Sequence, residues 1–260
     1  MHPIAFHLFG RPVYWYGIMA AAGFMAGLVH WNLLARRAGQ PRERPGDIAL
    51  WIMIGGLVGA RLLYVLVHIR YFADHPAEIL RVDHGGLIFY GGVAGAVVAV
   101  IALARRKRTP LWPLGDYAVS ALPLGHAFGR IGCFLNGCCH GHPVEGHWPA
   151  VRFPAESAAA YLYGRVPVHP VQLYEAGANL VLYGALLSLW FLPRRFRAGM
   201  LVAGYAAGYG LIRFGVEFLR GDERLRHAGL TTAQWASLLL IVTAVGIWRF
   251  MIRGHGNRRI

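Results

Sequence analysis

Charged side chains are scarce in this chain of 260 residues, where Asp, Glu, Lys and Arg together make up 15%. A typical soluble domain carries about a quarter. Acids are the scarcer sign, with 12 Asp and Glu against 26 Lys and Arg. Hydrophobic residues supply 56% of the chain, and the mean hydropathy is +0.42. This composition excludes an ordinary soluble domain and is typical of an integral membrane protein.

Cysteine is also rare, and its three copies, Cys133, Cys138 and Cys139, fall within seven residues. An odd, clustered set does not indicate a disulfide framework. Zinc binding is disfavoured because adjacent cysteines rarely both bind one tetrahedral ion. We therefore expect no metal and no cofactor, while a metal site or one external disulfide stays open. The N-terminus lacks a basic region before its first apolar run, so no cleavable signal peptide is expected.

Long hydrophobic runs are what the chain has in abundance. Seven are long enough to cross roughly 30 Å of hydrocarbon. They cover residues 13–35, 47–69, 87–104, 112–136, 172–192, 199–219 and 231–252. The predicted fold class is an all-α integral membrane protein with seven transmembrane helices, in a single domain over residues 1–260. Glycines four apart, such as Gly55/Gly59 and Gly91/Gly95, predict helices that pack closely in lipid.

Basic residues between the runs predict the orientation. Four segments, which follow runs one, three, five and seven, hold 14 Arg and Lys. These are Arg36, Arg37, Arg42, Arg44, Arg105, Arg106, Lys107, Arg108, Arg194, Arg195, Arg197, Arg253, Arg258 and Arg259. The other segments hold eight basic residues and seven acids. The N-terminus is therefore expected outside and the C-terminus in the cytoplasm. The basic excess is explained by topology, so nucleic acid is not an expected partner.

The connection 137–171 is the one long loop, and the orientation places it on the external side. It is rich in Pro, Gly and His, and a short helix is predicted near Pro154. His169, just before run five, could be either an ordinary interfacial residue or part of a site.

Arginines inside the apolar runs are the strongest functional signal. Arg61, Arg130 and Arg213 lie at membrane depth, where a charge costs at least a few kcal/mol. The alternating helix directions put the polar residues of six runs in the outer leaflet, which predicts one polar cavity. Only Glu175 and Glu217 are nearby acids, so the positive surplus suits an anionic lipid headgroup. A purely structural Arg213–Glu217 pair is the alternative.

Four segments resemble one known family. They are Gly85–Gly92 (GGLIFYGG), Gly129–Gly141 (GRIGCFLNGCCHG), His169–Glu175 (HPVQLYE) and Tyr209–Phe218 (YGLIRFGVEF). Together with Trp15-Tyr16-Gly17 and Gly59-Ala60-Arg61, they are similar to bacterial prolipoprotein diacylglyceryl transferases. The resemblance covers essentially the whole chain in order, so several motifs carry it together.

The resemblance implies an enzyme of the bacterial inner membrane whose active site faces the periplasm. Such an enzyme moves the diacylglyceryl group of phosphatidylglycerol onto the lipobox cysteine of a secreted prolipoprotein, and glycerol phosphate leaves. The implied partners are phosphatidylglycerol, the prolipoprotein signal peptide with its lipobox, and membrane lipids.

The resemblance also implies site residues. Arg130 matches an arginine that contacts the lipid phosphate, and Arg213 matches one that assists the leaving phosphate. The predicted catalytic residues are Arg130, Arg213, Tyr90 and Glu217. The predicted substrate-binding residues are Tyr16, Arg61, Gly91, Arg130, Asn136, Gly141, His169, Gln172, Tyr174, Glu175 and Tyr209.

The chain departs from the family pattern at three positions. Tyr90 stands where a histidine is common, and His84 does not align with that position. Cys133 replaces an asparagine, and Cys138 replaces an acidic residue. The group that takes the thiol proton is therefore open between Tyr90, Glu217, Glu175 and the positive field itself. Two alternatives follow: a non-catalytic membrane homologue, such as a transporter or metal-handling protein, or a lipid transferase of the same fold with another acceptor.

Overall fold

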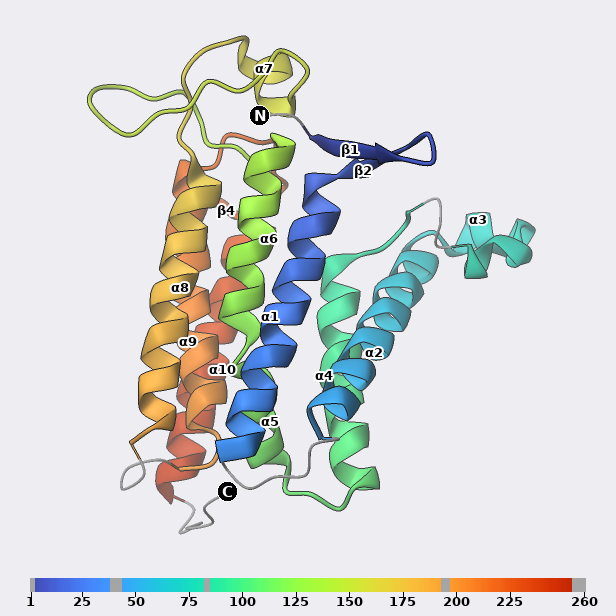
Figure 1. Cartoon of the computed structure of the whole chain (residues 1–260), viewed down its shortest axis with the longest axis vertical. Helices are drawn as coiled ribbons and strands as arrows, with labels where there is room; N and C mark the ends of the chain where they lie inside the picture. Colours follow the sequence, from blue (N-terminus) through green and yellow to red (C-terminus); the bar gives the residue numbers. More distant parts are fainter. Residues whose placement is uncertain (1–2, 38–43, 82–84, 193–196, 254–260) are drawn as a thin grey trace. The chain divides into compact units, whose positions relative to one another are not determined.

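The computed structural model describes residues 3–37, 44–81, 85–192 and 197–253. Arg42, His84, Arg194, Arg195, Arg258 and Arg259 lie outside the described residues, as do the side chains of Arg44 and Arg253. The described part is built from helices (Figure 1). The helices are α1 (Trp15–Arg37), α2 (Arg44–Val67), α3 (Ile69–Asp74), α4 (Phe89–Arg106), α5 (Leu111–Val119), α6 (Leu122–Asn136), α7 (Ala158–Tyr163), α8 (Val171–Trp190), α9 (Met200–Val216) and α10 (Thr232–Arg253).

Short elements complete the described chain. Two are 3-10 helices, η1 (Pro76–Leu80) and η2 (Glu217–Leu219). The others form two antiparallel hairpins, β1 (Ile4–Leu8) with β2 (Arg11–Tyr14) and β3 (Arg226–His227) with β4 (Leu230–Thr231).

Each of the seven predicted runs contains a helix, and the all-α membrane class is confirmed. Among the described residues, five helical segments are long and apolar enough to cross a membrane. They are Trp15–Arg37, Pro45–Val67, Phe89–Arg106, Leu111–Asn136 and Thr232–Ile252. Helices α8 and α9 are not among them: α9 has 17 residues, and α8 carries polar residues such as Gln172 and Asn179. Seven crossings and the orientation stay predictions.

The fourth predicted run is divided into α5 and α6. Pro123 sits in the first turn of α6. Its ring has no N–H and would clash with the carbonyl four residues earlier, that of Val119. Helix α5 ends at that residue.

The chain forms two compact units, residues 1–30 with 119–260 and residues 31–118. In the second unit α2 packs against α4. A Cβ on Gly55 would lie 2.7 Å from the carbonyl oxygen of Gly95, and one on Gly59 would meet that of Gly91. The prediction that these glycines allow close packing is confirmed. The single-domain description itself stays a prediction.

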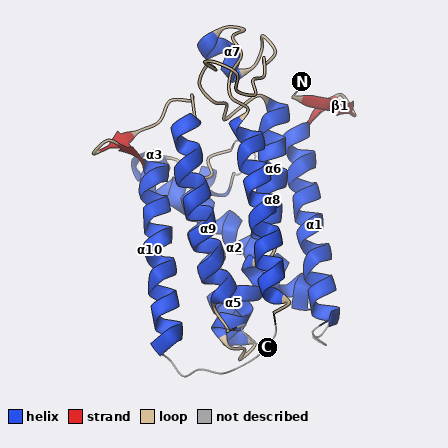
Figure 2. Cartoon of the chain, turned by 90° about the vertical axis from the view of Figure 1, so that its left-hand side faces the viewer, coloured by secondary structure: helices blue, strands red, loops and turns tan. Residues whose placement is uncertain are grey.

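In the first unit α6, α8, α9 and α10 run side by side (Figures 1 and 2). The ends of α6 and α9 and the beginnings of α8 and α10 lie together, at the end where the loop with α7 emerges (Figure 2). The alternating directions predicted for these helices are therefore confirmed, and their outer polar residues are brought to one end.

The loop between α6 and α8 is folded onto this end by backbone pairing. Gly141 N–H donates to His169 O at 3.0 Å, and Gly221 N–H donates to His140 O at 3.1 Å. A small core of Phe153, Ala159 and Val168 holds the rest of the loop. The short helix of this loop begins later than the prediction near Pro154, at Ala158. Ser157 caps it by accepting a bond from Ala160 N–H at 3.1 Å.

Candidate functional site

Two arginines of the first unit pair with buried carboxylates where the helices meet. Arg130 of α6 lies with its Nε 3.0 Å from Glu175 Oε1 of α8, and the Glu175 side chain is only 1% exposed. Arg213 of α9 lies with its Nη2 2.6 Å from Glu217 Oε2, one turn further on. Glu217 is as deeply buried as Glu175. Buried charges require such partners, because desolvation costs several kcal/mol for each ion.

The second pair continues into a chain of charges after α9. Glu217 Oε1 lies 3.9 Å from Arg224 Nε, and Arg224 Nη2 lies 2.8 Å from Asp222 Oδ2. Arg220 donates two bonds of 2.8 Å to the two oxygens of Asp222. Burial raises the pKa of Asp222, but the bonds and charge of Arg220 outweigh it and lower that pKa below its ordinary value.

The charged residues of this site do not balance. Four arginines, Arg130, Arg213, Arg220 and Arg224, share three carboxylates. Within this set of ion pairs one positive charge is therefore left over. The sequence predicted a surplus of positive charge from Arg61, Arg130 and Arg213. In this unit the surplus instead involves Arg220 and Arg224 together with Arg130 and Arg213.

Several buried polar atoms beside these pairs have no hydrogen-bond partner in the described part of the chain. Arg213 Nη1 is one, and the side-chain carbonyl oxygens of Gln172 and Asn179 are two others. Buried groups of this kind require an explanation such as a bound molecule, since nearly all buried polar groups in proteins are paired. The Arg213 nitrogen is therefore a buried donor without a partner among the described residues.

Aromatic side chains lie beside Arg130 and the neighbouring turns of α6. Tyr209 interacts with Arg130 and stacks on Tyr205, with ring centroids 5.7 Å apart. His126, one turn before Arg130, lies 4.6 Å from the Tyr209 ring. Tyr16, at the start of α1, lies against the backbone of Gly132. The predicted site residues Tyr16, Arg130 and Tyr209 are thus neighbours of one another or of the same turn of α6.

A cavity of about 820 Å³ opens at the same end of the unit. Its walls include Glu217, Arg220, Asp222 and Arg224. The carboxylate that holds Arg213 therefore lines a space large enough for a ligand of several hundred cubic ångströms.

Predicted site residues at and just before the start of α8 contact the loop that precedes this helix. Gln172 Nε2 donates to Cys138 O at 2.7 Å, and Tyr174 donates its hydroxyl to Pro149 O at 3.0 Å. His169 is buried, and its ring packs edge-on against His142. Burial and the nearby His142 lower the pKa of His169. Through these contacts Gln172, Tyr174 and His169 hold the loop in place.

Gly141 and Asn136 lie where the backbone of the same loop is most constrained. A Cβ on Gly141 would lie 2.6 Å from both the Cβ and the carbonyl oxygen of His169. Asn136 is the last residue of α6, which ends in a Schellman motif. The amide of Cys138 bonds to Cys133 O at 3.1 Å, and that of Gly137 bonds to Phe134 O at 3.2 Å.

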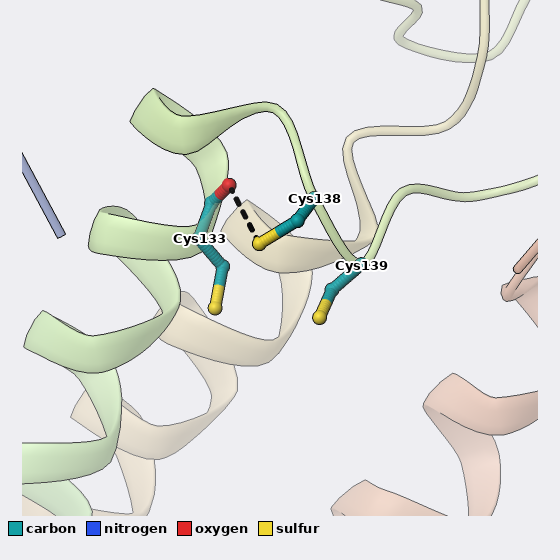
Figure 3. A group of neighbouring side chains, drawn as sticks. All are labelled: Cys133, Cys138 and Cys139. Carbon is teal, nitrogen blue, oxygen red and sulfur yellow. Dashed lines mark hydrogen bonds between the residues drawn. The ribbon is translucent and has the colours of Figure 1, made fainter. Parts of the chain in front are cut away.

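The three cysteines meet directly after that turn (Figure 3). All are free thiols, and their sulfur atoms lie within 4.8 Å of one another. Hydrogen bonds from Cys133 and Cys138, and then the charge of Arg220, lower the pKa of Cys139. The sequence did not predict that the three sulfur atoms meet, because Cys138 and Cys139 are adjacent in the chain.

Three predicted residues belong to the second unit. Arg61 donates four bonds to backbone carbonyls, those of Glu78, Ile79, Gly85 and Gly86, over 2.6–3.1 Å. Its guanidinium is therefore occupied in holding the segment after α2. Tyr90 is 46% exposed, and Gly91 packs on α2. Their predicted roles in substrate binding and catalysis are not tested by these contacts.

Sequence reasoning missed the charges that follow α9. Arg220, Asp222 and Arg224 were counted only as loop residues, although they continue the Arg213–Glu217 pair. Their spacing of two residues has the period of a strand and not of a helix, so it did not connect them with the Arg213–Glu217 pair on α9. Arg220 and Asp222, two residues apart, form a bidentate pair.

Comparison with known proteins places these features in context. The family model described as prolipoprotein diacylglyceryl transferase matches residues 3–250. The phosphatidylglycerol–prolipoprotein diacylglyceryl transferase of Clostridium tetani is 34% identical over 97% of this chain and 98% of its own length. Those of Idiomarina loihiensis and Geobacillus kaustophilus are 34% and 36% identical over 94% and 93% of this chain, covering 90% and 89% of their own lengths.

Proposed function

The chain belongs to the prolipoprotein diacylglyceryl transferase family, and from this we propose that it lipidates secreted prolipoproteins. It transfers the diacylglyceryl group of phosphatidylglycerol to the thiol of a lipobox cysteine. A carbon–sulfur bond forms at the glyceryl carbon while the bond from that carbon to the phosphate oxygen breaks. Glycerol phosphate leaves with the electron pair, and the product is a thioether.

The observation that carries this proposal is the buried, unpartnered Nη1 of Arg213. A lipid phosphate oxygen would give this nitrogen the partner that it lacks in the described part of the chain. Guanidinium groups match the geometry of phosphate oxygens, and their charge attracts a phosphate most strongly where water is excluded. One preorganised donor to a developing anion contributes about 3–4 kcal/mol to a rate.

Arg130 supplies the second guanidinium of the proposed site. Its Nε is held by Glu175, and its side chain keeps 21% exposure, so part of it remains accessible from outside. With Arg213 it would bind the phosphate in the ground state and stabilise the glycerol phosphate as it leaves. Tyr16, Tyr209 and Asn136 are the proposed neighbours of the bound lipid.

The carboxylates have a different part in this scheme. Glu217 lies between Arg213 and Arg224, and Glu175 is paired with Arg130. Each is held by an arginine and is better suited to orienting that arginine than to accepting a proton. Tyr90 stays a predicted catalytic residue, and Arg61, Gly91, Gly141, His169, Gln172 and Tyr174 stay predicted substrate-side residues.

The proposed setting is the bacterial inner membrane, with α8 and α9 added to the five apolar segments to give seven crossings. The basic residues of the connecting segments support an external N-terminus. The end of the first unit that carries Arg130 and Arg213 would then face the periplasm, where a secreted prolipoprotein presents its lipobox.

The test is transfer by the purified protein in vesicles containing phosphatidylglycerol, read as the mass gain of a lipobox peptide. Arg213→Gln and Arg130→Gln should each lower the rate at least about 100-fold, the effect of a lost 3–4 kcal/mol donor. Arg165→Gln, at an exposed loop position, is the matched control and should retain activity. Full activity in Arg213→Gln protein would overturn the phosphate role.

A further inference from the structure

The reaction described so far does not use the cluster of Cys133, Cys138 and Cys139. Its sulfur atoms are arranged more specifically than packing alone requires. Cys133 is in the last turn of α6, and the αL residue Gly137 (φ +73°) turns the chain back over it. Cys138 is thereby placed above Cys133, to whose carbonyl oxygen its Sγ lies at 3.7 Å. Figure 3 shows the three sulfur atoms turned toward a common space.

Cys139 reaches that space only through an unusual backbone conformation. Its φ is +59°, in the left-handed region that few non-glycine residues occupy. Side chains of successive extended residues point to opposite sides, whereas this conformation brings Cys139 to the side of Cys138. Such backbone strain persists where surrounding structure holds it, and it clusters at functional sites. The objection that adjacent cysteines do not share one ion is therefore removed by this backbone.

The spacing of the sulfurs suits one thiophilic ion. Zinc binds thiolates at about 2.3 Å in tetrahedral sites, so its sulfur ligands lie about 3.8 Å apart. The sulfur atoms lie within 4.8 Å of one another, so binding one ion requires them to approach by up to about 1 Å. A disulfide between Cys138 and Cys139 is disfavoured, because consecutive Cα atoms are about 3.8 Å apart while disulfides usually need at least about 4.4 Å.

The surroundings provide the support that a metal centre requires. Gln172 fixes the Cys138 peptide through its 2.7 Å bond to the carbonyl oxygen. Three thiolates around one Zn²⁺ carry a net negative charge, and two arginines lie close enough to offset it. Arg220 interacts electrostatically with Cys139, and Arg130 interacts in the same way with Cys133 and Cys139.

We propose that Cys133, Cys138 and Cys139 bind Zn²⁺ and leave its fourth position open for the thiol of the acceptor peptide. Three protein ligands with one open position are typical of catalytic rather than structural zinc. This inference rests on the proposed transferase function and names how its acceptor is activated. The carboxylates Glu175 and Glu217, each paired with arginine, leave that task open.

In the proposed transfer, the acceptor thiol binds the open position on the zinc ion and releases its proton to water, so that its sulfur is bound as thiolate. That sulfur attacks the glyceryl carbon of the lipid, and the carbon–oxygen bond to phosphate breaks as the carbon–sulfur bond forms. Glycerol phosphate leaves with the electron pair between Arg130 and Arg213. The thioether product is a weaker ligand than thiolate and dissociates from the metal.

The experiment measures metal first and activity second. Full-length protein purified under reducing conditions should retain about one zinc per chain after dialysis, measured by mass spectrometry. Replacement by Co²⁺ should give thiolate-to-cobalt charge-transfer absorption. Adding a lipobox peptide should change the cobalt ligand-field bands, whereas the same peptide with serine for cysteine should not change them.

Variants separate the two proposals. Cys138→Ser and Cys139→Ser should lose the stoichiometric metal and the cobalt spectrum, and Arg220→Gln should weaken metal binding about 10–100-fold as a supporting residue. Arg213→Gln should keep the metal and its response to peptide while losing transfer. That pattern supports the zinc site whatever becomes of the phosphate role.

Four outcomes would overturn the inference. These are no metal in reduced, zinc-supplemented wild-type protein, metal retained in both cysteine variants, a native disulfide among the three cysteines, or a cobalt spectrum indifferent to the peptide thiol. The first, third and fourth of these outcomes are measured on wild-type protein, so the misfolding of a variant cannot explain them. Zinc with a thiol response but no lipid transfer would leave the metal site standing and reject the proposed function.

Discussion

Arg213 holds Glu217 at 2.6 Å with one guanidinium nitrogen while its other terminal nitrogen is buried without a partner in the described chain. The two residues are one helical turn apart at the end of α9. The carboxylate fixes the direction of the guanidinium and offsets its charge, and the second nitrogen is left for a ligand. The ion pair does not use every donor of Arg213, so a structural role of the pair and the proposed binding of phosphate do not exclude each other.

Removing the carboxylate alone should be worse than removing both groups. Glu217→Gln leaves the Arg213 charge buried without its partner, and such a break typically costs about 3–5 kcal/mol. The double variant Arg213→Gln with Glu217→Gln should recover much of that loss in thermal unfolding, yet remain inactive in transfer. Glu217→Gln protein of unchanged stability but lost activity would contradict the orienting role and favour Glu217 as a base.

Much of this arrangement could be predicted from hydrophobic periodicity and helix direction. Runs of apolar residues located the helices, and alternating directions brought Arg130 to Glu175. The position of Arg61 shows the limit of this reasoning, because depth alone cannot tell whether its donors face a ligand or the carbonyls of a nearby loop. The cysteines show another limit: their convergence depends on a positive φ at Cys139, which side-chain identity does not encode.

The pair of Arg220 and Asp222 predicts a dependence of stability on pH. Burial opposes ionisation of Asp222, but Arg220 lowers its pKa below the ordinary value. The unfolded chain then binds the proton more readily, so this stabilisation is present above the unfolded pKa of about 3.9 and is lost as pH falls through the native pKa. The melting temperature in detergent should fall below about pH 5, and less steeply in Asp222→Asn protein. Asp74→Asn, at an exposed carboxylate, is the control; equal slopes in all three proteins would refute the assignment.

Close packing of α2 on α4 predicts opposite responses at neighbouring glycines. A Cβ on Gly59 would collide with the Gly91 backbone, whereas one on Gly56 would lie 3.7 Å from Gly92 O, an ordinary contact. Gly59→Ala should therefore destabilise the protein by about 1–3 kcal/mol, the usual cost of overpacking. Gly56→Ala should be neutral or slightly stabilising, since alanine has the better helix propensity. Equal unfolding temperatures for the two variants would show that the helices are not in this contact.

The four bonds of Arg61 predict a structural rather than a chemical defect. Lysine keeps the charge but cannot donate to Glu78, Ile79, Gly85 and Gly86 at once, because its single ammonium lacks the planar fork. Arg61→Lys should increase amide exchange at 78–81 and 85–86 and lower the unfolding temperature, with transfer reduced only in proportion to unfolding. Lost transfer with unchanged exchange would instead support the predicted role of Arg61 in substrate binding.

Gly141 gives the sharpest test of how the loop positions the site. Its amide donates to His169 O at 3.0 Å, and a Cβ would lie 2.6 Å from that same oxygen and 2.9 Å from Leu219 O. Neither backbone oxygen can move without breaking the pairings that join the loop to the start of α8 and the end of η2. Gly141→Ala should therefore cost about 1–3 kcal/mol of stability.

The same substitution should also disturb chemistry at a distance, because Gly141 lies two residues after Cys139 and pairs with Arg220 across the backbone. Gly177→Ala is the matched control, since a Cβ there would meet nothing within 4 Å in the described structure. We expect Gly141→Ala protein to lose transfer under conditions where it remains folded by circular dichroism, while Gly177→Ala protein remains active. If both variants transfer lipid equally well, the pairing of loop and helix ends does not position the reacting groups.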